Sequence, residues 1–143
     1  MKLKVLSFSG ENFSHDHAFS VTVMTTSWEV TLLDSHAPMM TSLEPCILYI
    51  KYMDENNMEK REDFAIGKWV LEVHYSEVKI LSDMLIDIEE VDMDQASAAK
   101  ERALELMEKY KHAKDRVDME KFIEAEDMLM KSIAQLKLYD LKK

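Results

Sequence analysis

The sequence holds one cysteine, two glycines and fewer basic than acidic residues, and each shortage argues against a class of function. Cys46 has no second cysteine for a disulfide or a Cys-x-x-Cys motif, which argues against redox and zinc chemistry. The net charge of −10 argues against a nucleic-acid-binding surface, because such a surface needs basic residues to displace counterions from phosphates. The sequence has neither a glycine-rich phosphate loop nor a nucleophile elbow, so we expect no catalytic residue, no enzyme activity and no cofactor.

Long hydrophobic runs are also missing. No stretch approaches the roughly 18 apolar residues that a membrane span requires, and the first residues lack a continuous apolar segment typical of an export signal. We therefore expect no membrane crossing and a cytosolic compartment. A length of 143 residues suits one domain, or a compact domain with an appended element.

The first part of the chain alternates apolar and polar residues with a period of two, which predicts half-buried strands. Turn clusters at residues 10–12, 54–57 and 74–76 separate the runs. The pattern predicts an antiparallel β-sandwich of about seven to ten strands over residues 1–87. The alternating runs are at residues 3–8, 19–25, 29–33, 47–53, 69–74 and 77–81.

After residue 85 the period changes to that of a helix. Asp92 is a good N-cap, and Gln95 completes a pair resembling a capping box. Two apolar stripes separated by a polar break at residues 112–118 predict an antiparallel two-helix hairpin over residues 88–143, and thus an α+β fold. Such a hairpin buries little alone, so it must lie on the sandwich or on another protein. The stripes are Ala96, Ala99, Ala103, Leu106 and Tyr110, then Phe122, Ala125, Leu129, Ile133 and Leu136.

Three segments, in order, carry a family resemblance. The first runs from Glu29 through His36-Ala37-Pro38-Met39-Met40 to Leu43-Glu44-Pro45, and the second spans residues 63–83. The third joins residues 91–103 to residues 132–143. Together they resemble the epsilon subunit of rotary F-type ATP synthases, a β-sandwich followed by a helical hairpin.

The resemblance implies a non-catalytic subunit of the central rotor stalk, which couples the catalytic head to the membrane rotor ring. Its partners would be the gamma subunit, the rotor ring and, transiently, the alpha and beta subunits of the head. The C-terminal helices would restrain ATP hydrolysis. The subunit would sit peripherally at the cytoplasmic face of the bacterial cell membrane.

The resemblance also implies a partner contact surface, formed by Glu29, His36, Pro38, Met39, Met40 and Leu43. A proline fixes the chain there, and methionines adapt to an irregular apolar partner. An alternative stays open, in which His36 and Pro38 shape a tight connection between strands while Met39 and Met40 fill the core. Family glycines are replaced at several positions, including Ser35, so we expect Asp34 or an asparagine to take the left-handed backbone conformation.

Some members of the family bind ATP at the helices, and the matching residues here are Asp92, Arg102 and Lys131. Gln95 replaces the first arginine of that motif, while Lys131 and Gln135 stand where ATP-binding members carry arginines. Glutamine offers no charge-assisted contact to a phosphate, so we expect weak or absent binding.

The sequence offers two further interpretations. His15-Asp16-His17 puts two histidines on one face of a possible strand, but no convergent third ligand can be named, so we expect a solvated turn and no metal site. As an alternative function, the chain could be a stand-alone β-sandwich that binds a small ligand under a helical lid.

Overall fold

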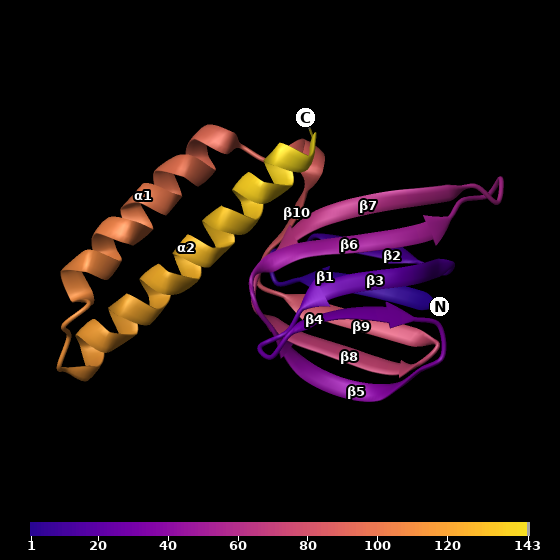
Figure 1. Cartoon of the computed structure of the whole chain (residues 1–143), viewed down its shortest axis with the longest axis horizontal. Helices are drawn as coiled ribbons and strands as arrows, with labels where there is room; N and C mark the ends of the chain where they lie inside the picture. Colours follow the sequence, from indigo (N-terminus) through magenta and orange to yellow (C-terminus); the bar gives the residue numbers. More distant parts are fainter. Residues whose placement is uncertain (143) are drawn as a thin grey trace.

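The computed structural model describes residues 1–142 and shows two five-stranded sheets packed face to face, followed by two helices (Figure 1). The α+β architecture, a sandwich and then a helical hairpin, is confirmed. The first sheet, sheet A, has the order β2 (Asn12–His15), β1 (Lys2–Ser7), β9 (Glu77–Ser82), β8 (Trp69–Tyr75) and β5 (His36–Leu43). The second, sheet B, has the order β10 (Leu85–Asp87), β7 (Glu59–Ile66), β6 (Cys46–Met53), β3 (Ala18–Met24) and β4 (Glu29–Leu33).

The strand pairs are antiparallel except one. β1 and β9 run parallel, from Lys2 opposite Glu77 to Ser7 opposite Ser82. The predicted antiparallel sandwich is therefore confirmed, with this one parallel pair among the described strands. Because most of the sandwich lies between these strands in sequence, no hairpin turn obliges them to be antiparallel, and a long crossover permits parallel pairing.

The core lies between the sheets and is built by the predicted alternation. In β1, Leu3 and Val5 are buried while their neighbours are exposed, and Val78 and Ile80 do the same in β9. A slip of one residue would turn each of these side chains to solvent, so the apolar pattern fixes the register.

β5 is an edge strand that contains the proline of the His36–Met40 segment. His36 pairs with Tyr75 but Met39 pairs with Val73, so β5 holds one residue more than β8 over this stretch. That register shift is a β-bulge, and Pro38 falls inside it. Proline has no N–H to donate, and edge strands and bulges are the places in a sheet that tolerate it.

The turn before β5 uses Ser35 in the left-handed region, with φ of 63°. We expected Asp34 or an asparagine there. Asp34 instead accepts a hydrogen bond from the Ser35 N–H through Oδ1 (2.9 Å). Asp34 thus stabilises the turn without itself adopting positive φ. Asn57, with φ of 59°, takes the left-handed conformation in the β6–β7 turn.

The helices are α1 (Met93–Tyr110) and α2 (Arg116–Lys142), preceded by a short 3₁₀ helix, η1 (Ile88–Glu90). Asp92 caps α1 as predicted, accepting from the Gln95 N–H at 3.0 Å. Ala96 and Ala103 are buried on α1 and Ala125 on α2, and their small side chains let the two helices approach closely.

The hairpin rests on the sandwich through one end of α2. Ala134 and Leu138 of α2 are buried against Ala65 of β7, with Ile47 and Met84 beside them. The predicted α2 stripe missed Ala134 and Leu138, because α2 faces both α1 and the sandwich and a single-stripe pattern describes only one of these contacts. The other end of the hairpin projects away from the sheets (Figure 1).

Candidate partner interface

The His36–Met40 segment lies along the free edge of sheet A. Met40 is 69% exposed and Pro38 is exposed, whereas Met39 is half-buried against the core. His36 donates from Nδ1 to the carbonyl of Ala37 at 2.7 Å, which leaves Nε2 as an acceptor. The segment therefore exposes the apolar Pro38 and Met40 beside the His36 ring, while Met39 packs beneath them against the core.

The other two residues of the expected contact surface are not on this exposed part of the edge. Leu43, at the end of β5, is 2% exposed and belongs to the sandwich core, so its side chain has little area to offer a partner. Glu29 points to the outer face of sheet B, where it lines a groove of about 330 Å³ beneath α2. Met40 faces outward from sheet A. The remaining residues thus do not form one flat face.

Four aromatic side chains outside the expected contact surface are more than half exposed among the described residues. They are Phe8, Trp28, Trp69 and Tyr75, and the rings of Phe8 and Trp69 meet edge to face with centroids 5.2 Å apart. Leu33 is exposed as well. A sequence signal for Leu33 existed, because adjacent apolar residues in a strand point to opposite faces, so Leu32 and Leu33 cannot both enter the core.

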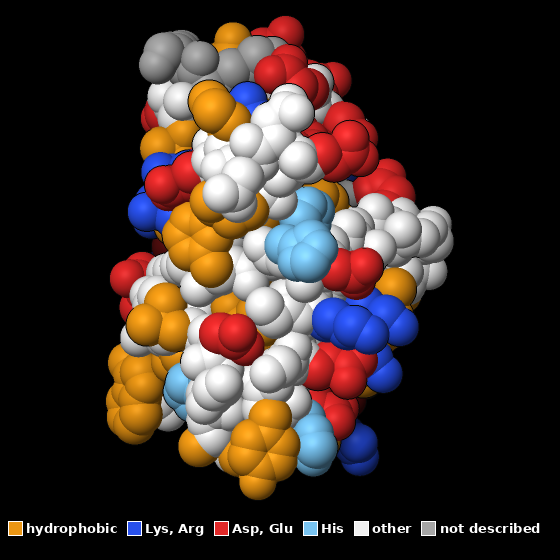
Figure 2. All heavy atoms as spheres, turned by 90° about the vertical axis from the view of Figure 1, so that its right-hand side faces the viewer, with side chains coloured by type: hydrophobic (Ala, Val, Ile, Leu, Met, Phe, Trp, Pro, Cys, Tyr) orange, Lys and Arg blue, Asp and Glu red, His pale blue; other side chains and the backbone are white. Residues whose placement is uncertain are grey.

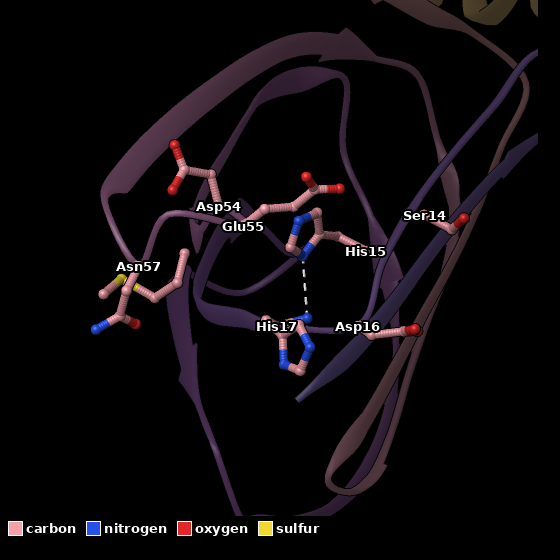
Figure 3. A pocket seen from close by; sticks show the side chains of 8 residues that line it. Ser14, His15, Asp16, His17, Asp54, Glu55 and Asn57 are labelled. Atoms are coloured by element: carbon pink, nitrogen blue, oxygen red, sulfur yellow. Dashed lines mark hydrogen bonds between the residues drawn. The ribbon is translucent and has the colours of Figure 1, made fainter.

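The end of the sandwich far from the hairpin carries mixed groups. Figure 2 looks onto this end and shows histidine, acidic and hydrophobic side chains in small separate groups. His15 and His17 line a hollow there with Asp54 and Glu55 (Figure 3). His15 Nδ1 accepts from the His17 N–H at 3.0 Å, and Asp54 Oδ1 accepts from the N–H groups of its own turn. Within residues 1–142, no three histidine, cysteine or acidic side chains are placed to hold a metal ion.

Ion pairs join α2 to the sandwich. Lys131 Nζ lies 2.8 Å from Asp83 Oδ2, after β9, and 3.0 Å from Asp127 Oδ2, one turn back on α2. Burial lowers the pKa of Lys131, but hydrogen bonds to both carboxylates and their attraction outweigh it, so the pKa is raised above its usual 10.5. Lys131 therefore stays charged at neutral pH.

The residues of the expected nucleotide set are largely engaged within the protein. Asp92 caps α1 and Lys131 is held by two carboxylates, while Arg102 is exposed on α1. Gln135 donates from Nε2 to the sulfur of Met84 at 3.4 Å. A nucleotide would have to displace these internal contacts.

Cys46 faces the groove beneath α2, which Met130, Ile133 and Lys137 line from the helix side. Burial raises the pKa of its thiol to about 11, although a hydrogen bond from the backbone N–H of Met24 acts in the other direction. The thiol is therefore a weak nucleophile at neutral pH.

Comparison with known proteins places this architecture in a family. A family model described as ATP synthase, Delta/Epsilon chain, beta-sandwich domain matches residues 1–88. An ATP synthase epsilon chain from Desulfitobacterium hafniense is 34% identical over 134 residues, covering 94% of this chain and 92% of the relative. The chain belongs to the ATP synthase epsilon chain family. Another epsilon chain, from an Exiguobacterium species, is 31% identical over 140 residues, covering 98% of this chain and 96% of its own length.

Solved structures share the epsilon chain fold. A chain of the Euglena gracilis mitochondrial ATP synthase superposes with a TM-score of 0.65 at 21% identity, over 90% of this chain and 74% of that one. A chain of the Tetrahymena thermophila mitochondrial ATP synthase central stalk and c-ring superposes with a TM-score of 0.54 at 20% identity, over 66% and 72%. Neither described helix is long and apolar enough to pass through a bilayer.

Proposed function

We propose that this epsilon chain is a non-catalytic subunit of the central stalk of an ATP synthase, linking the catalytic head to the membrane rotor ring. The observation that carries the proposal is the match to epsilon chains across both the sandwich and the hairpin, over 94% of the chain. A stand-alone ligand-binding protein would have no reason to share that combination along its whole length.

The gamma subunit and the rotor ring are the proposed partners of the sandwich. The edge of sheet A supports this, because Met40 and Pro38 are exposed on β5, which among the described residues is bridged on its outer side only at its Leu43 end, by Thr25. Glu29 contributes a separate contact on sheet B. The subunit is then held at the membrane through the complex, at the cytoplasmic face of a bacterial cell membrane.

The hairpin is proposed to regulate ATP hydrolysis. It touches the sandwich through one end of α2, while apolar residues such as Leu104, Val117 and Ile123 stay exposed along its projecting part. This contact is a cluster separate from the sandwich core, so the hairpin can leave without unfolding the sheets, and binding to the alpha and beta subunits can draw it away. The undocked hairpin restrains the head, and the docked hairpin does not.

A pull-down with the tagged full-length chain from membranes tests the assembly. We expect it to recover the gamma subunit and the rotor ring. Met40→Ala should reduce recovery, whereas the matched control Met58→Ala, which truncates another exposed methionine in the β6–β7 turn, should leave it unchanged. Recovery of no ATP synthase subunit would refute the proposal.

Nucleotide binding by the isolated chain should be weak, because Lys131 is already paired and Gln95 and Gln135 are uncharged. ATP added at a concentration below its Kd should stabilise the fold by less than about 0.4 kcal/mol, since stabilisation follows RT ln(1 + [L]/Kd). The double variant Gln95→Arg with Gln135→Arg should bind more tightly. A large thermal shift of the unchanged protein with ATP would contradict this.

A further inference from the structure

The contact between α2 and the sandwich has an ionic centre. Lys131 sends its ammonium group toward Asp83 at 2.8 Å, and the two side chains are only 24% and 21% exposed. Asp83 lies between β9 and β10, so this hydrogen-bonded pair crosses from the hairpin to the sheets. The neighbouring contact, from Gln135 to Met84, crosses at the next residue of the same connection.

Asp127 and Lys68 extend the group. Asp127 holds Lys131 from one turn earlier on the same helix at 3.0 Å, and Lys68 of the β7–β8 connection approaches Asp127 at 4.0 Å. The Lys131–Asp127 pair lies within α2 and survives any movement of the hairpin. Asp127 therefore keeps Lys131 oriented, and undocking breaks the short pair with Asp83 together with the longer contact between Asp127 and Lys68.

Gly67 provides the room for this arrangement. A Cβ at Gly67 would collide with Oδ1 of Asp83 and lie 2.9 Å from Cε of Lys131. Its backbone N–H donates to Ser82 Oγ at 2.9 Å, which fixes the connection beneath the carboxylate. Asp83 Oδ1 is buried without a hydrogen-bond partner among the described residues, so this carboxylate depends on Lys131 for compensation.

We propose that Asp83, Lys131 and Asp127, seated over Gly67, form a latch that holds the helical hairpin against the sandwich in the absence of any ligand. When the latch is closed, Asp83 is half-buried and paired. When it opens, Asp83 is hydrated and Lys131 keeps only Asp127. The latch is a property of the chain alone; its effect on hydrolysis rests on the proposed function.

Cys46, the only cysteine in the sequence, provides a natural reporter of the latch. It lines the groove opposite Met130 and Ile133 of α2, so undocking uncovers the thiol. The rate at which N-ethylmaleimide modifies Cys46 in the native full-length chain, followed by mass spectrometry, measures how often the hairpin leaves the sandwich. Circular dichroism of the same samples shows whether the sheets remain folded.

Lys131→Met and Asp83→Asn should each speed labelling about tenfold, the size expected for loss of a partly buried charge-assisted hydrogen bond. The double variant should be no faster than either single variant, because both remove the same contact. Arg116→Gln is the matched control, since it removes an exposed α2 ion pair with Glu120 and should leave the rate unchanged.

Gly67→Ala opens the latch by another route and should also speed labelling. Gly10→Ala, at the other glycine, strains a backbone with φ of 94° in open space and should lower stability without exposing Cys46. Unchanged labelling in both Lys131→Met and Asp83→Asn would overturn the latch. Additive effects in the double variant, or loss of the β-sheet signal in Lys131→Met, would overturn it too, because Lys131 would then act independently of Asp83 or be required for the fold.

A hydrolysis assay on the assembled synthase separates the latch from the proposed function. Lys131→Met should lower ATP hydrolysis, because it frees the hairpin to restrain the head. Faster Cys46 labelling with unchanged hydrolysis would keep the latch and count against the restraining role of the hairpin.

Discussion

At the scale of single residues, Ser35 occupies a backbone conformation that suits glycine. We expect Ser35→Gly to be more stable than Ser35→Val by about 1–2 kcal/mol, because a β-branched side chain clashes with the backbone at positive φ. Urea unfolding followed by circular dichroism measures the difference. Ser14 in β2 is the control, where valine should be favoured over glycine. Equal midpoints for the two Ser35 variants would contradict the turn geometry.

Glu62 should make stability depend on pH. It lies on the core-facing side of β7, and burial, together with the charges of Asp87 and Asp63, raises its pKa above 4.5. A carboxyl whose pKa is raised on folding stabilises the protein when protonated, and this contribution is lost as pH rises through the folded pKa. Glu62→Gln should therefore raise the free energy of unfolding at pH 7 relative to the unchanged protein, with the gain disappearing below about pH 4. A gain of equal size at both pH values would contradict this.

The prediction confirmed at this scale, the N-cap of α1, rests on local chemistry. Asp92 caps α1 because an aspartate three residues before a helical N–H is sufficient to satisfy it. The family motif groups Leu43 with Met40, whereas alternation along β5 after the bulge turns Leu43 and Met39 toward the core and Met40 outward. The sequence did not identify Ser35 as the residue with positive φ. The position of the left-handed residue depends on which neighbour accepts the hydrogen bond in the turn, and here Asp34 accepts it from Ser35.

At the scale of elements, β5 carries one exposed methionine, Met40, and one that packs against the core, Met39. Met40→Ala should leave the melting temperature of the isolated chain unchanged but weaken assembly with the gamma subunit. Met39→Ala should lower stability by about 1–2 kcal/mol, less than the 2–5 kcal/mol typical of a fully buried methionine, because Met39 is half-buried. Thermal unfolding and pull-down of both variants test this. If Met40→Ala lowered stability and Met39→Ala weakened assembly instead, the assignment of Met40 to the partner contact and Met39 to the core would be refuted.

The elements with clear alternation were predictable, and the short or irregular ones were not. β1, β3 and β9 show apolar residues every second position, which the core requires. β6 is apolar on both faces, because its outer face lies beneath α2. β2 and β10 are too short to show a period, and β5 has its period broken by the bulge. The parallel pairing of β1 with β9 could not be predicted from local sequence, because it depends on the path of all the strands that lie between them in the chain.

At the scale of the whole molecule, two units meet through a small contact. The sandwich has its own continuous core between the sheets, and the contact with α2 is a separate cluster around Ala65, Ala134 and Leu138. We therefore propose that residues 1–87 fold without the helices. In the proposed function, this division lets the sandwich hold the partners while the hairpin moves.

In the proposed division of labour, the sandwich couples the head to the rotor and the hairpin restrains hydrolysis. The most direct measurement is ATP hydrolysis by synthase assembled with the full-length chain or with residues 1–87, at equal recovery of the gamma subunit. We predict faster hydrolysis with residues 1–87, because the retained sheets carry the assembly contacts and the deleted helices carry the restraint. Equal hydrolysis by the two complexes would contradict the claim.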